Sequence, residues 1–224
     1  MKLILGIDDS GRGPLIGPMI LAGVLVNEKQ EAILKKHGIK DSKMLTHAQR
    51  LEMGKIIEKN IIEKKIVKAY PKEIDEAVNS DVNLNTLEAM KTAEIINAIN
   101  KKKEKISIII DCPSNNKRMW ANKMITFLEH TENLDIRCEH KADRDYVAVS
   151  AASILAKNMR EEEVAKIKKQ YGDTGSGYPA DPVTQKFLKE EGERLKDSGI
   201  FRKSWATWKK LFPEKSQATL GEFR

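Results

Sequence analysis

Cysteine is scarce in this chain, and its scarcity excludes several protein classes. Cys112 and Cys138 are the only two cysteines among 224 residues. Two cysteines cannot build the disulfide framework of a small secreted domain or a four-cysteine zinc site. The sequence therefore favours a reduced compartment, and we expect a cytoplasmic protein.

Long hydrophobic runs are missing as well. The apolar run at the N-terminus covers only residues 3–7 and is followed by Asp8 and Asp9. This run is too short for the core of a signal peptide, and a bilayer span needs about 20 apolar residues. We therefore expect no membrane partner.

Charge is abundant, and its balance is basic. The chain has 40 Lys and Arg against 33 Asp and Glu, a net charge of +7 with a pI near 9.2. A basic surface favours polyanionic partners such as nucleic acid. Many Lys- and Glu-rich proteins, including those of thermophiles, simply have highly charged solvated surfaces. The charge therefore ranks functions without choosing one.

Hydrophobic periodicity predicts an α/β protein. Apolar runs predict strands at 2–7, 17–26, 61–70, 106–111 and 134–139. Helical spacing predicts helices at 47–59, 84–101 and 147–169, the last with small residues in its first half. Beyond the glycine-rich segment 171–179 the chain is again polar and helical, which indicates a C-terminal lobe.

Four aspartates occupy positions at which carboxylates could converge. Asp8 and Asp9 follow an apolar strand, Asp111 ends another, and Asp143 precedes a helix of small residues. Adjacent negative charges at the end of a buried strand need a compensating cation or solvent. Hard oxygen ligands suit magnesium or manganese rather than zinc. Each aspartate alone is more often a helix cap or turn former, and it is the set of four that favours a metal site.

The glycine-rich turn after Asp9 matches neither common nucleotide-binding motif. Gly11 and Gly13 precede a strand rather than a helix, and no P-loop lysine follows them. The glycines either let a ligand approach the backbone closely or merely permit the turn. Lys43 could likewise face a phosphate or lie in a solvated loop. Tyr178, in a constrained loop, could stack on a sugar or base or pack beneath its own loop.

Taken together, a chain of short motifs resembles ribonuclease HII in its archaeal form. The motifs keep the order and spacing of that family along nearly the whole chain. They are residues 6–14 (GIDDSGRGP), 40–43 (KDSK), the strand ending at Asp111, 140–143 (HKAD), 150–154 (SAASI), 175–179 (GSGYP) and 204–207 (SWAT).

This resemblance implies a ribonuclease H-like fold, a five-stranded mixed sheet flanked by helices with a helical C-terminal lobe. It implies a catalytic and metal-binding quartet of Asp8, Asp9, Asp111 and Asp143. The family's usual second acid is glutamate, so Asp9 is one methylene shorter, and Ser10 replaces the usual alanine. We expect metal binding to survive with altered ligand reach and metal preference.

The resemblance also implies the reaction. We expect an endonuclease that hydrolyses the RNA strand of RNA–DNA hybrids, and that cuts 5′ of single ribonucleotides embedded in duplex DNA. Catalysis by Mg²⁺ or Mn²⁺ needs no protein nucleophile and should leave 5′-phosphate and 3′-hydroxyl ends. Gly11, Arg12 and Gly13 would read the 2′-hydroxyl, Lys43 would hold the backbone, and Tyr178 would stack on the following deoxyribose.

The C-terminal tail resembles a sliding-clamp-binding peptide. Gln217, Leu220 and Phe223 stand in its anchor positions, but Arg224 replaces a usual aromatic residue, so we expect weakened clamp binding. The same spacing could arise by chance in a frayed terminus. We expect a monomer divided into a catalytic domain (1–170), a C-terminal helical lobe with the substrate loop (171–216) and this tail (217–224).

Two other functions fit part of the pattern. A related ribonuclease H-like nuclease, such as a junction resolvase, would share the acidic cluster without the ribonucleotide-reading loop. A noncatalytic module could bind hybrids through its basic surface alone. Cleavage at a single embedded ribonucleotide, lost on adding a chelator, separates ribonuclease HII from both.

Overall fold

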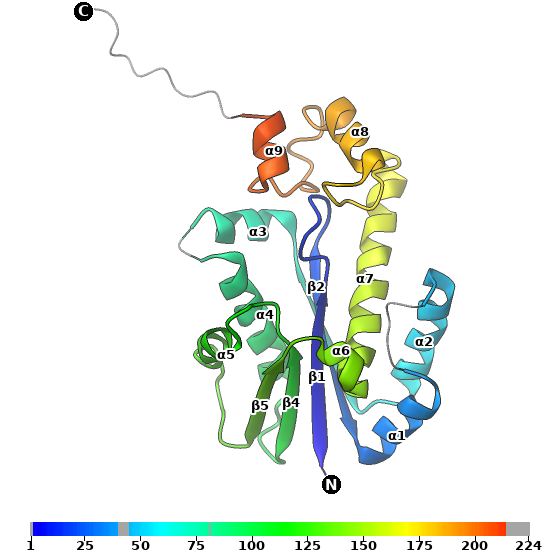
Figure 1. The fold of residues 1–224 in the computed structure, drawn as a ribbon, viewed down its shortest axis with the longest axis vertical. Helices are drawn as coiled ribbons and strands as arrows, with labels where there is room; N and C mark the ends of the chain where they lie inside the picture. The colour runs from blue at the N-terminus through cyan, green and yellow to red at the C-terminus, as the bar shows by residue number, and fades with distance from the viewer. Residues whose placement is uncertain (1, 40–44, 81, 214–224) are drawn as a thin grey trace, which may run out of the picture.

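The computed structural model describes residues 2–39, 45–80 and 82–213, which form a five-stranded sheet covered by helices (Figure 1). The strand order is β3-β2-β1-β4-β5. β2 is antiparallel to both β1 and β3, whereas β4 is parallel to β1 and β5 is parallel to β4. The strands are β1 (Leu3–Ser10), β2 (Met19–Asn27), β3 (Glu63–Ala69), β4 (Ile106–Asp111) and β5 (Leu134–Glu139). The predicted five-stranded mixed sheet is confirmed.

β1 is longer than the sequence predicted. It continues past Ile7 to Ser10, because β2 keeps pairing with it as far as the pair of Ser10 and Ile20. Asp8 and Asp9 therefore lie inside the strand, where successive side chains point to opposite faces of the sheet. This alternation separates the side chains of two residues that are adjacent in sequence.

The helices lie on both faces of the sheet and above its upper edge (Figure 1). In chain order they are α1 (Glu28–Lys36), α2 (His47–Lys59), α3 (Pro71–Val78), α4 (Leu84–Ile99), α5 (Lys117–Ile125), α6 (Ala142–Asp145), α7 (Val147–Tyr171), α8 (Pro182–Glu191) and α9 (Ala206–Leu211). The helices predicted at 47–59, 84–101 and 147–169 are confirmed as α2, α4 and α7.

Four short helices were not predicted: α1, α3, α5 and the four-residue α6. The first three have a recognisable start signal but no long apolar period. Asn27 caps α1, its side chain accepting hydrogen bonds from two backbone amides. Pro71 opens α3, and the Asn116 side chain accepts from the amide of Met119 at the start of α5. Such caps locate a helix start even where the helix is too short to show a clear period.

Two apolar clusters hold the layers together. On one face, Ile7 and its neighbours in the strands pack against α4 and α5; on the other, Ile4 and its neighbours pack against α7. A Cβ built on Gly6 would lie only 2.2 Å from the backbone carbon of Ala148, so glycine lets α7 lie directly against β1. The small residues of α7 fill this close contact, as the sequence predicted.

A third apolar cluster joins the C-terminal helices to the loop between β1 and β2. Leu15 and Ile16 of that loop pack with Phe187, Phe201 and Trp208. This cluster fixes the loop from above, while the sheet fixes it from below. The division at residues 170 and 216 stays a prediction. Within the described ranges, no helix is long and apolar enough to cross a membrane.

Candidate metal centre and adjoining loop

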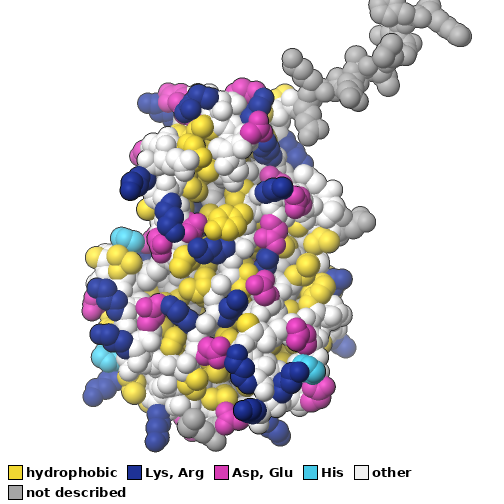
Figure 2. Space-filling view, turned by 180° about the vertical axis from the view of Figure 1, so that it is seen from behind, with side chains coloured by type: hydrophobic (Ala, Val, Ile, Leu, Met, Phe, Trp, Pro, Cys, Tyr) yellow, Lys and Arg dark blue, Asp and Glu magenta, His cyan; other side chains and the backbone are white. Residues whose placement is uncertain are grey.

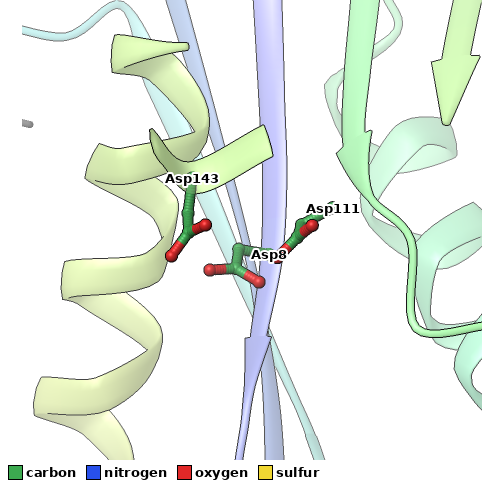
Figure 3. A group of neighbouring side chains, drawn as sticks. All are labelled: Asp8, Asp111 and Asp143. Carbon is green, nitrogen blue, oxygen red and sulfur yellow. The ribbon is translucent and has the colours of Figure 1, made fainter. Parts of the chain in front are cut away.

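Three carboxylates converge at one edge of the sheet (Figure 3). Asp8 lies on β1, Asp111 ends β4, and Asp143 lies on α6. One oxygen from each carboxylate lies within 4.8 Å of the other two. The parallel pairing of Ile7 with Ile110 sets Asp8 beside Asp111, and α6, which follows β5, brings Asp143 to them.

The trio is largely withdrawn from water. Asp8 is 7% exposed and Asp143 is 2% exposed, and the Asp111 side chain accepts a hydrogen bond from the amide of Ala142 at 3.1 Å. Burial raises the pKa of Asp8 well above its ordinary value, and the charge of Asp9 raises it further. Clustered carboxylates in a poorly solvated site fit a divalent cation with a preference for oxygen ligands.

Asp9 is not part of this trio. As the next residue in β1, it has its side chain turned away from that of Asp8, and it lines a cavity of about 10 Å³ that Asp8, Asp111, Glu88 and Trp120 also line. Burial raises the pKa of Asp9 to about 6, although the positive charge of Arg12 opposes the shift. The structure therefore gathers three members of the expected quartet within ligand distance of one another, and the fourth, Asp9, shares a small cavity with two of them.

Arg12 is anchored to α4. Its guanidinium forms an ion pair with Glu88 and donates a hydrogen bond to Asn85 Oδ1 at 2.8 Å. Glu88 is only 1% exposed, so the carboxylate of this ion pair is buried. The sequence led us to expect that Arg12 faces the substrate. It did not point to Glu88, for which the only indication was an acidic residue among the apolar positions of a predicted helix.

The carbonyl groups of the same loop are held by residues near the C-terminus. Arg202 is fully buried and donates hydrogen bonds to the carbonyl oxygens of Gly11 and Arg12, both at 2.7 Å. The indole N–H of Trp205 donates to the carbonyl oxygen of Gly13 at 3.0 Å. With the carbonyls turned inward, the amide N–H groups of Arg12 and Gly13 have no acceptor within residues 2–39, 45–80 and 82–213.

Burial lowers the pKa of Arg202 to about 9, and the neighbouring positive charge of Arg160 adds to the effect. Neither arginine was singled out from the sequence. The segment 204–207 was noticed as a motif, but no local pattern showed that Arg202 just before it would reach the loop between β1 and β2.

Tyr178 lies over this loop. The residue is 44% exposed, and a Cβ built on Gly13 would lie 3.4 Å from its ring. Below it, the Arg160 guanidinium lies 5.5 Å from the ring centroid and donates to the carbonyl oxygen of Ser176 at 3.2 Å. Because residue 13 is a glycine, no side chain fills the space between the Tyr178 ring and the backbone of the turn. The ring and the turn therefore lie side by side.

Several predicted positions lie outside the described residues. These are Lys43 and the proposed clamp-binding residues Gln217, Leu220 and Phe223. Both cysteines are free thiols, and Cys112 is buried, as expected for a small apolar residue.

Comparison with known proteins gives a consistent result. The family model described as ribonuclease HII matches residues 5–208. Ribonuclease HII of Methanococcus maripaludis strain C6 is 44% identical over 214 residues, covering 95% of this chain and 88% of its own. Ribonuclease HII of Methanocaldococcus jannaschii is 39% identical over 229 residues, covering 97% and 98%.

Solved structures show the same relationship. The crystal structure of ribonuclease H2 from Pyrococcus horikoshii OT3 superposes with a TM-score of 0.83 at 35% identity, covering 93% of this chain and 96% of that one. Ribonuclease HII from Archaeoglobus fulgidus, solved in complex with PCNA, gives 0.79 at 33% identity and covers 99% and 100%.

Proposed function

Since this chain belongs to the ribonuclease HII family and is an endoribonuclease, we propose that the carboxylates of Asp8, Asp111 and Asp143, with Asp9 beside them, form its catalytic centre. The substrate is the RNA strand of an RNA–DNA hybrid. One observation carries the proposal: three carboxylates from different elements, two of them buried, converge beside a loop in which the amides of Arg12 and Gly13 have no acceptor among the described residues.

The centre is suited to Mg²⁺ or Mn²⁺. Bound divalent ions supply an activated water and stabilise charge on the leaving oxygen. Asp8 and Asp111, on adjacent parallel strands, would hold the principal ion. Asp143 from α6 and Asp9, which shares a small cavity with Asp8 and Asp111, would complete the coordination or order a second ion and the water. The backbone amide of Asp9 donates a hydrogen bond to Asp8 Oδ1 at 2.8 Å.

The ribonucleotide is recognised by the loop above the centre. The amide N–H groups of Arg12 and Gly13 face the 2′-hydroxyl, while Gly11 permits the turn with a φ of 87°. Tyr178 stacks on the deoxyribose that follows. This arrangement allows incision 5′ of one embedded ribonucleotide and leaves 5′-phosphate and 3′-hydroxyl ends. Lys43 holds the backbone of the same strand.

The tail adds a second partner. The Archaeoglobus fulgidus relative was solved with PCNA, and Gln217, Leu220 and Phe223 stand in the anchor positions of a clamp-binding peptide here. Arg224 replaces an aromatic anchor, so this chain binds a sliding clamp weakly, as a monomer in the cytoplasm. Titration of the clamp with the intact chain and with a Phe223→Ala variant tests the contact.

One experiment tests the main proposal. A DNA duplex with one ribonucleotide is incubated with the protein, with Mg²⁺ or Mn²⁺ or with a chelator, and the product ends are mapped. We expect metal-dependent incision on the 5′ side of the ribonucleotide and none in an all-DNA duplex. Cleavage of a four-way junction without ribonucleotide incision would instead indicate a resolvase, and binding without cleavage a noncatalytic module.

A further inference from the structure

A second pocket lies next to the candidate metal centre. It has a volume of about 230 Å³ and is lined by the N-terminal turn of α4 and by α5, including Thr86, Ser114 and Trp120. Trp120 also lines the small cavity behind Asp9, and Ser114 is three residues after Asp111. Trp120 thus lines both the pocket and the acidic cavity.

The polar groups that line this pocket suit an anion. They include the hydroxyls of Thr86 and Ser114, the amide of Asn85 and the ammonium of Lys123, with no carboxylate among them. The segment 112–128, which contains α5, has three basic residues and no acidic one. On the face of the molecule shown in Figure 2, by contrast, basic and acidic side chains are intermixed. The segment with α5 thus carries charge of one sign.

Hydrogen-bonding groups at this pocket are left without partners inside the protein. The Thr86 hydroxyl has none within the described ranges, and neither does the indole N–H of Trp120, a residue only 4% exposed. Buried donors are nearly always paired in folded proteins, and leaving one unpaired costs stability. Lys123 has no carboxylate within ion-pair distance among the described residues, and its ammonium lies 5.4 Å from the centroid of the Phe127 ring. The Thr86 hydroxyl and the Lys123 ammonium line the pocket and can meet a ligand, whereas the indole N–H of Trp120 is buried.

The pocket is tied to the loop that we assign to ribonucleotide recognition. Asn85, at its rim, accepts a hydrogen bond from Arg12 Nη2 at 2.8 Å. Its wall also has an apolar part, because Met119 is 63% exposed there beside the Trp120 ring. A cation, two hydroxyls and an apolar wall together match one nucleotide unit: a phosphate and the sugar attached to it. Of the two hydroxyls, Ser114 Oγ already accepts a hydrogen bond from the amide of Asn116 at 3.3 Å, and its O–H remains to donate.

We propose that this pocket binds one nucleotide of the nucleic acid whose scissile bond lies at the metal centre, its phosphate against Lys123 and its sugar against Met119. The inference rests on the proposed function, since it extends the path of the same substrate. It makes Lys123 and Thr86 binding residues that the family motifs in this sequence do not include.

The test measures binding apart from cleavage. In an Asp8→Asn background, fluorescence anisotropy of a labelled RNA–DNA hybrid is followed across roughly 50 to 200 mM salt for Lys123→Gln. Lys103→Gln is the matched control, an equal charge change at the other end of β4. We expect Lys123→Gln to lower affinity about threefold to tenfold and to reduce the salt slope by about one, with Lys103→Gln unchanged. Equal effects of both variants would overturn the proposal.

A substitution that leaves the net charge unchanged distinguishes a contact made in the pocket from a general electrostatic effect on substrate binding. Thr86→Val keeps the shape of the side chain and removes the free hydroxyl. In the active enzyme we expect KM to rise about threefold while kcat stays unchanged. Unchanged KM would overturn the assignment of Thr86, and a fall in kcat alone would mean that the residue supports the centre structurally.

The strand that occupies the pocket is identified by neutralising single phosphates. Uncharged methylphosphonates are placed one at a time in the ribonucleotide strand or its complement. The position at which Lys123→Gln no longer lowers the affinity identifies the phosphate that Lys123 contacts. No such position in either strand would overturn the proposal. If the unmodified enzyme fails to cut hybrids while the Lys123 effect persists, the proposed activity is wrong and the binding pocket stands.

Discussion

Arg202 donates two hydrogen bonds to the carbonyl oxygen of Gly17, from Nε at 3.0 Å and from Nη2 at 2.9 Å, across 185 residues of sequence. Together with its bonds to Gly11 and Arg12, this buried guanidinium closes both ends of the loop between β1 and β2. A residue of the C-terminal lobe therefore sets the conformation of the loop beside the metal centre.

Replacing Arg202 should damage both stability and activity. Arg202→Met leaves several buried carbonyl groups without a donor, and we expect a loss of about 3 kcal/mol or more in the free energy of unfolding. Denaturant unfolding and hybrid cleavage measure the two effects. Arg194→Met, an exposed arginine of the same lobe, is the control. An Arg202 variant as stable and active as that control would contradict the role.

Asp8→Asn should abolish cleavage and leave the fold intact. Removing one of several crowded carboxylates relieves repulsion and the cost of burying a charge, so the metal-free variant should melt at a higher temperature. Asp145→Asn, an exposed aspartate near Asp143, should retain activity. Activity surviving in Asp8→Asn and in Asp111→Asn would place the chemistry elsewhere.

Stability of the metal-free protein should fall as pH rises through the mildly acidic range. Asp9 has a pKa of about 6 in the folded state against 3.8 for the ordinary group, so the folded protein keeps a proton that the unfolded chain releases. Its contribution is fully present below pH 3.8 and is lost as pH rises toward 6. Thermal melting from acid to neutral pH checks this, and Asp9→Asn should flatten the profile.

Asp9→Glu restores the acid that is usual in the family. The added methylene must fit a cavity of about 10 Å³ behind β1, beside Glu88 and Trp120. We expect metal-dependent cleavage to be preserved, with a changed dependence on Mg²⁺ and Mn²⁺ concentration. Complete inactivation of a folded variant would mean that the site is built around the shorter side chain.

Tyr178→Ala should impair cleavage at a single embedded ribonucleotide more than cleavage within a long RNA strand. Only a junction offers the deoxyribose on which the ring stacks, and such stacking contributes about 1–3 kcal/mol, roughly tenfold or more in rate. Cleavage of both substrates is compared at one salt and metal concentration. Tyr178→Phe keeps the ring and should behave like the parent. Equal losses on both substrates would indicate a general disturbance of the loop.

The sequence by itself determined the sheet and most of the acidic centre. Apolar runs located all five strands, because strands buried between helices are composed mainly of apolar residues. Two of those runs end at or beside Asp8 and Asp111. The motif containing Asp143 supplied the third carboxylate. The small residues of α7 also predicted its close contact with the sheet.

Only the tertiary structure decided how these groups face one another. The extra pairing of β1 with β2 turns the Asp9 side chain away from that of Asp8, its neighbour in sequence, and sets it at a small cavity that Asp8 and Asp111 also line. Glu88 and Arg202 hold the loop between β1 and β2, because the packing of α4 and of the C-terminal lobe brings them to it. Such long-range contacts leave no periodic pattern, since they depend on where whole elements lie and not on the residues beside them.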